Sequence, residues 1–184
     1  MEPVTKRWAR LGPNNPRTLV HVPEYGVCLS TFIIAKRRNS ILLLRPRAHD
    51  AWETKGAFPE GRAAELAKEG AWLLPATHLL MGESPDRAAR RIVREWAGLR
   101  GNPRFLMVQS HTRPGGFLAQ KLKGKHWDIC FVYELAGATK PKAKPWWSEA
   151  RFVPAARISR MNLGRGHLDI LHEAGMVRKT RLGY

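Results

Sequence analysis

Residues 77–99 read THLLMGESPDRAARRIVREWAGL, and this stretch decides the fold. Ser84 is a favourable helix N-cap, because its hydroxyl can accept a hydrogen bond from a free backbone N–H of the first turn. Pro85 suits the first helical position, where no N–H is needed. Gly98 can end the same helix in a left-handed conformation. The sequence therefore predicts a helix over residues 85–97.

Apolar runs on both sides of this helix indicate a sheet. Residues 25–36 and 41–44 are rich in apolar and β-branched side chains and predict a hairpin around the charged turn at 36–39. Proline cannot donate to a strand ladder, so Pro46 is expected to end the second strand. The other predicted elements are a polar insertion at 48–70 with a short helix at 63–68, strands at 71–75, 105–108, 129–135 and 152–153, and a closing helix at 168–174. Strands and helices in this order predict one α+β domain.

The order of these elements and the residues of the helix resemble the Nudix family, which is named for hydrolases of nucleoside diphosphate derivatives. The family box is G-x5-E-x7-R-E-U-x-E-E-x-G-U, where U is apolar. When the box is laid from Thr77, six of its nine positions agree, namely Glu83, Arg91, Val93, Glu95, Gly98 and Leu99. The resemblance implies an α/β/α sandwich with a mixed central sheet over residues 25–177, flanked by a basic arm at 1–24 and a basic tail at 178–184.

The departures from the box concern its chemistry. Thr77 replaces a glycine, and Ile92 and Trp96 replace two glutamates. In the family, carboxylates on this helix are presented toward magnesium and the diphosphate, and a hard divalent ion needs several oxygen ligands together. Two apolar side chains supply none, and with Ala88, Ala89 and Val93 they form an apolar stripe at helical spacing. The sequence predicts a degenerate box with no catalytic residue and no metal.

A metal-dependent hydrolase is the alternative interpretation. Glu83, Arg91 and Glu95 would then be catalytic, Glu83 and Glu95 would bind Mg²⁺, and a further carboxylate such as Glu149 or Asp128 would assist. Without catalysis, Arg91 and Glu95 are expected to form an intrahelical ion pair, and Glu83 to bond nearby backbone amides.

Charge is the strongest feature of the composition, because 32 Lys and Arg against 15 Asp and Glu leave a net charge of +17. Such a surface attracts polyanions, and lysines can neutralise phosphates while indoles stack on unpaired bases. The predicted nucleic-acid-binding residues are Lys36, Arg37, Arg38, Lys121, Lys123, Lys125, Trp127, Lys140, Lys142, Lys144, Trp146 and Trp147. In the alternative interpretation, the tryptophans pack in the core and the lysines are solvated.

We therefore expect a Nudix-fold protein that binds RNA or a ribonucleoprotein and is similar to the non-catalytic Nudix-like proteins of ribosomes. The ribosomal likeness rests on residues 72–75, WLLP, followed by Gly82 and Glu83. Besides the hydrolase, a nucleotide-sensing regulator that binds DNA is a further alternative, with a nucleotide as its ligand.

The hydropathy, cysteine and histidine patterns argue against a membrane span, a disulfide and a histidine metal site. No apolar run approaches the roughly 20 residues needed to cross a bilayer, so an intracellular protein without a membrane span is expected. Cys28 and Cys130 lie in apolar runs and are expected to be buried thiols. His111, His126 and His167 lack metal-ligand spacing and are expected to be structural or surface residues.

Overall fold

The computed structural model describes residues 27–54, 60–80, 82–110 and 127–178. Its six strands form a mixed sheet in the order β4-β5-β1-β2-β6, and β3 pairs with β1 beside this path. The strands are β1 (Val27–Arg37), β2 (Ser40–Pro46), β3 (Ala76–His78), β4 (Arg104–Ser110), β5 (Trp127–Leu135) and β6 (Trp147–Pro154). The predicted arm at 1–24 and most of the tail at 178–184 lie outside the described residues.

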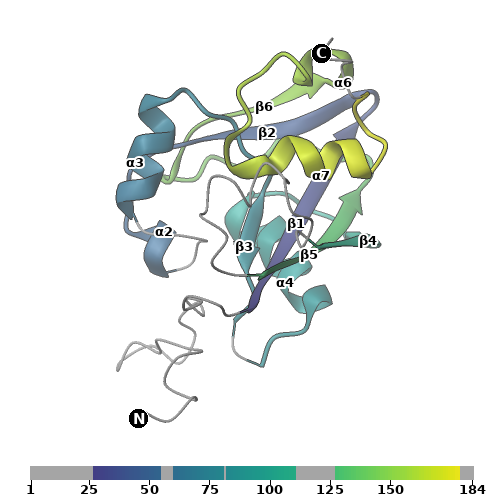
Figure 1. The fold of residues 1–184 in the computed structure, drawn as a ribbon, viewed down its shortest axis with the longest axis horizontal. Coiled ribbons are helices and arrows are strands. Elements are labelled where there is room, and N and C mark those ends of the chain that lie inside the picture. The colour runs from purple at the N-terminus through teal and green to yellow at the C-terminus, as the bar shows by residue number, and fades with distance from the viewer. Residues whose placement is uncertain (1–26, 55–59, 81, 111–126, 179–184) are drawn as a thin grey trace.

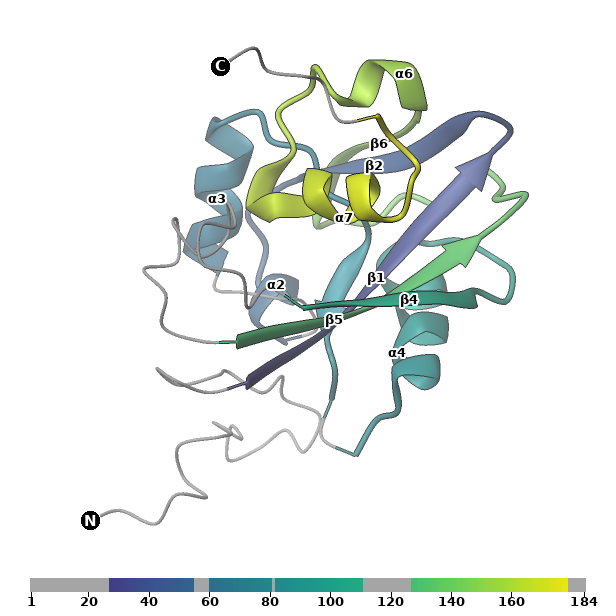
Figure 2. The ribbon, with the colours of Figure 1, turned by 45° about the vertical axis from the view of Figure 1, so that its right-hand side comes forward.

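Helices cover both faces of the sheet. They are α2 (Ala51–Thr54), α3 (Glu60–Lys68), α4 (Pro85–Arg91), the π-helical turn η1 (Ile92–Trp96), α6 (Ala155–Ile158), the 3-10 turn η2 (Gly164–Gly166) and α7 (His167–Glu173). Figures 1 and 2 show α7 on one side of β1 and α4 on the other. This arrangement confirms the predicted α+β class.

Alternating side chains of β1 separate the two halves of the core. Ile33 packs with Ile92 and Val93 of the η1 turn, whereas Ile34 packs with residues of α7 on the opposite face. β1 and β5 run parallel in continuous register from Val27 to Ala35, so the predicted strands at 25–36 and 129–135 are confirmed. A parallel strand covered on both faces is expected to be apolar, as residues 32–35 of β1 are.

Several sequence predictions differ from the structure at the edges of the sheet. The apolar strand predicted at 105–108 is β4, which is an edge strand in which Phe105 is 56% exposed and Val108 is 50% exposed. Residues 71–75 form only isolated bridges, through Trp72 and Leu73, rather than a strand. The strand predicted at 152–153 is longer, because β6 pairs with β2 along its length. In the described residues, no helix is both long and apolar enough to span a membrane.

Candidate functional site

The helix that carries the box residues, called the box helix below, consists of α4 and the η1 turn. It has the extent that the sequence predicts, but its last turn is unusual. The Ser84 hydroxyl caps the helix by accepting a hydrogen bond from the Arg87 N–H at 3.3 Å. From Ile92 onward the helix widens to π geometry, and the Ala97 N–H donates to the Ile92 carbonyl at 2.8 Å. Such π turns occur mostly as single turns inserted in α-helices.

Gly98 ends the box helix with a φ of +66°, as predicted for a left-handed cap. Its close approach to a neighbouring loop is a second reason for glycine at this position. A Cβ added there would lie 2.4 Å from the Lys142 carbonyl oxygen. The backbone N–H of Lys142 donates to the Gly98 carbonyl at 2.8 Å, so the loop is hydrogen-bonded directly to the end of the helix.

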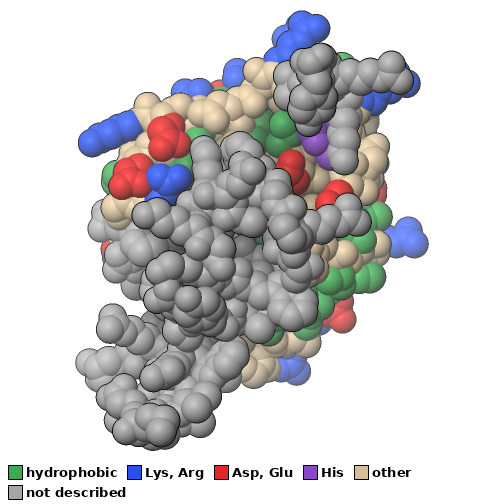
Figure 3. Space-filling model, in the orientation of Figure 1, with side chains coloured by type: hydrophobic (Ala, Val, Ile, Leu, Met, Phe, Trp, Pro, Cys, Tyr) green, Lys and Arg blue, Asp and Glu red, His purple; other side chains and the backbone are tan. Residues whose placement is uncertain are grey.

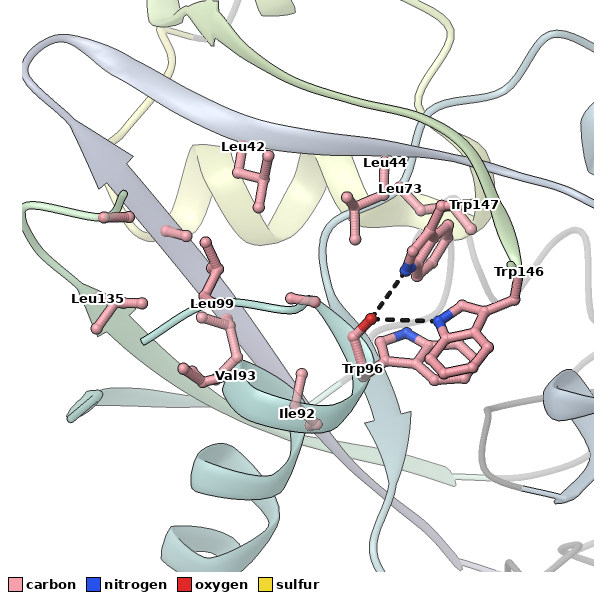
Figure 4. Packing of buried hydrophobic residues seen from close by; sticks show 14 of the residues in the cluster. Leu42, Leu44, Leu73, Ile92, Val93, Trp96, Leu99, Leu135, Trp146 and Trp147 are labelled. Carbon is pink, nitrogen blue, oxygen red and sulfur yellow. Dashed lines mark hydrogen bonds between the residues drawn. The ribbon is translucent and has the colours of Figure 1, made fainter. Parts of the chain in front are cut away.

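The two box positions that lack carboxylates face the core. Ile92 is 0% exposed and Trp96 is 2% exposed. Figure 4 shows Ile92 and Val93 pointing toward Leu42 across the core. These side chains belong to the continuous apolar cluster between the box helix and the sheet.

Four tryptophans meet where the box helix ends. The Trp96 ring stacks on Trp146 with centroids 5.2 Å apart, and Trp52 and Trp147 meet it edge-on. The indole N–H groups of Trp146 and Trp147 both donate to the Trp96 carbonyl oxygen, at 3.2 and 2.9 Å (Figure 4). Trp52 comes from the segment predicted as a polar insertion, yet it is 1% exposed. Stacked and edge-on pairs of this kind pack tightly, so hydrocarbon fills this side of the helix.

Glu83 is held by Arg91 rather than left open to a ligand. Its two carboxylate oxygens accept hydrogen bonds from Arg91 Nε at 2.8 Å and Nη2 at 2.7 Å. The Leu80 N–H also donates to Glu83 at 3.0 Å, as the interpretation without a metal predicts. Arg91 donates further to Thr77 Oγ1 and to the His78 carbonyl, both at 3.1 Å. The predicted ion pair between Arg91 and Glu95 is therefore wrong, because Arg91 ties the helix to β3 and the preceding loop.

The remaining carboxylates do not converge on the box helix. Glu95 is exposed, whereas the side chain of Glu83 is largely buried against Arg91. Glu149 pairs with Arg151 on β6, and the side chain of Asp128 lies outside the described part. Within the described ranges, no group of three or more His, Cys, Asp or Glu side chains is placed to hold a metal ion. These residues do not fit a divalent-ion cage on this helix.

Comparison with known proteins identifies the family. The family model described as the NUDIX domain matches residues 27–174. The chain belongs to the Nudix family. The E. coli ORF135 protein superposes with a TM-score of 0.56 at 12% identity, covering 87% of this chain and 96% of that chain. The MutT protein from Methanosarcina mazei Go1 gives a TM-score of 0.57 at 16% identity, covering 85% and 99%. These two structures share the fold of this chain at low identity, and no curated protein sequence matches the chain.

The basic residues predicted at the β1–β2 turn have different environments in the Nudix fold. Lys36 pairs with Glu134 at 3.3 Å, and the guanidinium of Arg37 lies 4.3 Å from the centroid of Phe152. Arg38 is exposed at a φ of 54° in the turn. Lys36 and Arg37 therefore have partners within the fold, and Arg38 faces solvent.

The predicted nucleic-acid-binding residues at 140–147 divide between the surface and the core. Lys140 and Lys142 are exposed, and Lys144 Nζ lies 5.6 Å from the centroid of Trp146. Trp146 and Trp147 are each 7% exposed, so the prediction that they stack on bases is wrong and the core-packing alternative is right. The predicted residues Lys121, Lys123 and Lys125 and the side chain of Trp127 lie outside the described residues.

His167 is a structural residue of the α7 layer, as predicted. Its Nδ1 accepts the Leu74 N–H at 2.8 Å, and its ring meets Phe32 edge-on at 5.1 Å. Burial lowers the pKa of His167 to about 3, so it is neutral at ordinary pH. Cys130 is buried, as expected. His111 and His126 lie outside the described residues.

Proposed function

We propose that this chain is a Nudix-fold protein that does not hydrolyse nucleotides and that binds RNA or a ribonucleoprotein through its basic surface. The absence of hydrolysis is proposed from one observation: Ile92 and Trp96 are buried, and the Trp96 ring packs against three other tryptophans. A carboxylate cage and a tryptophan cluster cannot occupy the same side of the helix. The family's hydrolytic chemistry needs the cage, because the metal offsets the charge of the diphosphate.

The rest of the box supports the same interpretation. Both oxygens of Glu83 already accept hydrogen bonds from Arg91, and replacing these by metal coordination would leave a largely buried guanidinium without its partner. Glu95 is the one box carboxylate that faces solvent in the described structure. A single exposed carboxylate binds a divalent ion weakly, because it replaces only one of the six or more oxygen ligands in the ion's hydration shell.

The net charge supports the proposed binding of RNA or a ribonucleoprotein. A net charge of +17 on 184 residues exceeds what solubility requires of a small domain. Polyphosphate backbones are the partners that such a charge favours, through release of their counterions. RNA or a ribonucleoprotein inside the cell, as for the non-catalytic Nudix-like proteins of ribosomes, is the partner that we propose.

A metal-dependent Nudix hydrolase is the second candidate, because the chain belongs to a family named for that activity. Glu83, Arg91 and Glu95 of the box are retained, and Mg²⁺ would be the cofactor. This candidate requires further carboxylates from segments outside the helix, since Ile92 and Trp96 offer no oxygen.

One paired experiment separates the two candidates. The purified protein and Glu95→Gln are incubated with Mg²⁺ or Mn²⁺ and a panel of nucleoside diphosphate derivatives, and phosphate-containing products are quantified. We expect the two proteins to show the same background. Turnover by the wild type that Glu95→Gln abolishes would establish the hydrolase. Retention of RNA on the immobilised protein is measured in parallel, and the proposal requires that it weaken steeply as salt is raised.

A further inference from the structure

The exposed face of the box helix carries three arginines. Arg87, Arg90 and Arg94 follow one another at intervals of three and four residues, which places them on one side of a helix. All three are exposed, whereas Ala88 and Ala89 between them are buried. Among the described residues, no carboxylate forms an ion pair with any of these three guanidinium groups. The helix therefore presents a side rich in arginine to solvent.

An exposed aromatic ring lies next to this cationic side. Phe105 of the edge strand β4 pairs with Tyr133 of β5, and their rings meet edge-to-face with centroids 5.5 Å apart. The Tyr133 hydroxyl donates to Asp86, in the first turn of α4, at 2.7 Å. Burial, and then the hydrogen bond to Asp86, raise the pKa of Tyr133, and the nearby charge of Arg90 opposes them. Tyr133 thus lies between Phe105 and the arginines.

The domain covers Phe105 only in part. More than half of its surface faces solvent, and Val108 and Leu106 on the same strand are also exposed. Figure 3 shows hydrophobic side chains at the edge where β4 runs in Figure 1. Contiguous exposed apolar side chains beside charged ones are typical of interaction sites.

On the opposite side of the molecule, the Lys and Arg side chains of the described residues are scattered (Figure 3). On the face seen in Figure 3, which is the α7 side, Lys and Arg side chains stand at separate places around the margin. Asp and Glu side chains interrupt them on the described part of that face. Arg87 and Arg90 of α4 and Arg94 of η1 instead stand in one row, about one turn apart.

We propose that Arg87, Arg90, Arg94 and Phe105 form a binding site for single-stranded RNA, in which the arginines contact phosphates and Phe105 stacks on an unpaired base. Stacking on an aromatic side chain requires a base that is free of its own duplex, which favours single strands over double-stranded RNA. Asp86 keeps its negative charge although Tyr133 donates to it, and the three arginines outnumber it on this side of the helix. This site rests on the proposed RNA-binding function and gives it a location.

The test compares two charge reversals of equal size. Arg90→Glu with Arg94→Glu changes the α4 face, and Arg157→Glu with Arg160→Glu makes the same change in net charge at α6. Arg157 and Arg160 are also exposed, and Figures 1 and 2 show α6 and α4 at opposite ends of the molecule. Binding of a labelled single-stranded RNA of about 12 nucleotides, within the usual site sizes, is measured by fluorescence anisotropy. Thermal unfolding checks that each variant is folded.

We expect the α4 variant to lose at least about tenfold in affinity and to have a shallower salt dependence, while the α6 variant stays within about threefold of the wild type. Phe105→Ala should weaken binding of the single strand by roughly fivefold or more and leave duplex RNA unaffected. Equal losses for the two charge variants would overturn the site but leave RNA binding in place. Absence of RNA binding by the wild type would overturn the proposed function and the site together.

A second copy of the chain is the competing occupant of the β4 edge, since exposed edge strands are templates for pairing. Light scattering on the wild type and Phe105→Ala decides this. If Phe105→Ala converts a dimer to a monomer and leaves RNA affinity unchanged, β4 is a self-association surface and the proposal is wrong. A wild type that is monomeric, with weaker RNA binding in Phe105→Ala, supports it.

Discussion

Replacing Trp96 by glutamate restores the residue type that the Nudix box has at this position, and we expect it to destabilise the protein. Trp96 is 2% exposed and contacts the rings of Trp52, Trp146 and Trp147. Loss of a fully buried tryptophan alone costs about 3–5 kcal/mol of unfolding free energy. Placing a carboxylate in the same apolar surroundings adds a desolvation cost. A domain of this size is typically stable by roughly 5–15 kcal/mol, so a large share would be lost.

The assay is urea unfolding followed by far-ultraviolet circular dichroism, with and without millimolar Mg²⁺. Arg94→Glu is the matched control, because it adds the same side chain to the same helix at an exposed position. We expect the control to stay within about 0.5 kcal/mol of the wild type. The reasoning is refuted if Trp96→Glu is as stable as the wild type and Mg²⁺ stabilises it further, because a carboxylate there would then be accommodated and would bind metal.

Three further predictions concern residues that stabilise the box helix and the α7 layer. Gly98→Ala should destabilise more than Gly137→Ala, although both glycines have positive φ, because only at Gly98 would the new Cβ meet backbone; urea midpoints measure the difference. Glu83→Gln should cost about 3 kcal/mol by breaking a largely buried bidentate pair, whereas Glu149→Gln at an exposed pair should cost under about 1 kcal/mol. Because the folded-state pKa of His167 lies near 3, below its ordinary 6.5, stability should fall as the pH drops through that window, by at most about 1.4 kcal/mol per pH unit; a flat urea midpoint over this range would contradict it.

The elements with local signals could be predicted from the sequence. Ser84 and Gly98 mark the two ends of the box helix through capping chemistry that depends on a few neighbouring residues, and the structure has both caps. Runs of apolar residues predicted the strands β1 and β5, because this signal also lies within a short stretch of sequence. The π turn at the end of the helix has no comparable signal in the local sequence.

Features that depend on contacts between distant segments could not be predicted. Trp52 lies in a four-residue helix with no periodicity of its own, and only the fold brings it against Trp96. Phe105 reads like any core strand residue, because nothing in the local pattern says that β4 has a neighbour on one side only. Helical spacing predicted an ion pair between Arg91 and Glu95. In the structure Arg91 instead binds both carboxylate oxygens of Glu83 in the preceding loop, at a position less exposed to solvent.

Direct titration of the protein with Mn²⁺, monitored by electron paramagnetic resonance, tests most sharply whether the box helix can hold a divalent ion. With Ile92 and Trp96 in the core and Glu83 bound to Arg91, we predict that the signal of free hydrated Mn²⁺ grows linearly from the first addition. Glu95→Gln should give the same line as the wild type. Loss of the free signal at one equivalent in the wild type, restored by Glu95→Gln, would contradict the account.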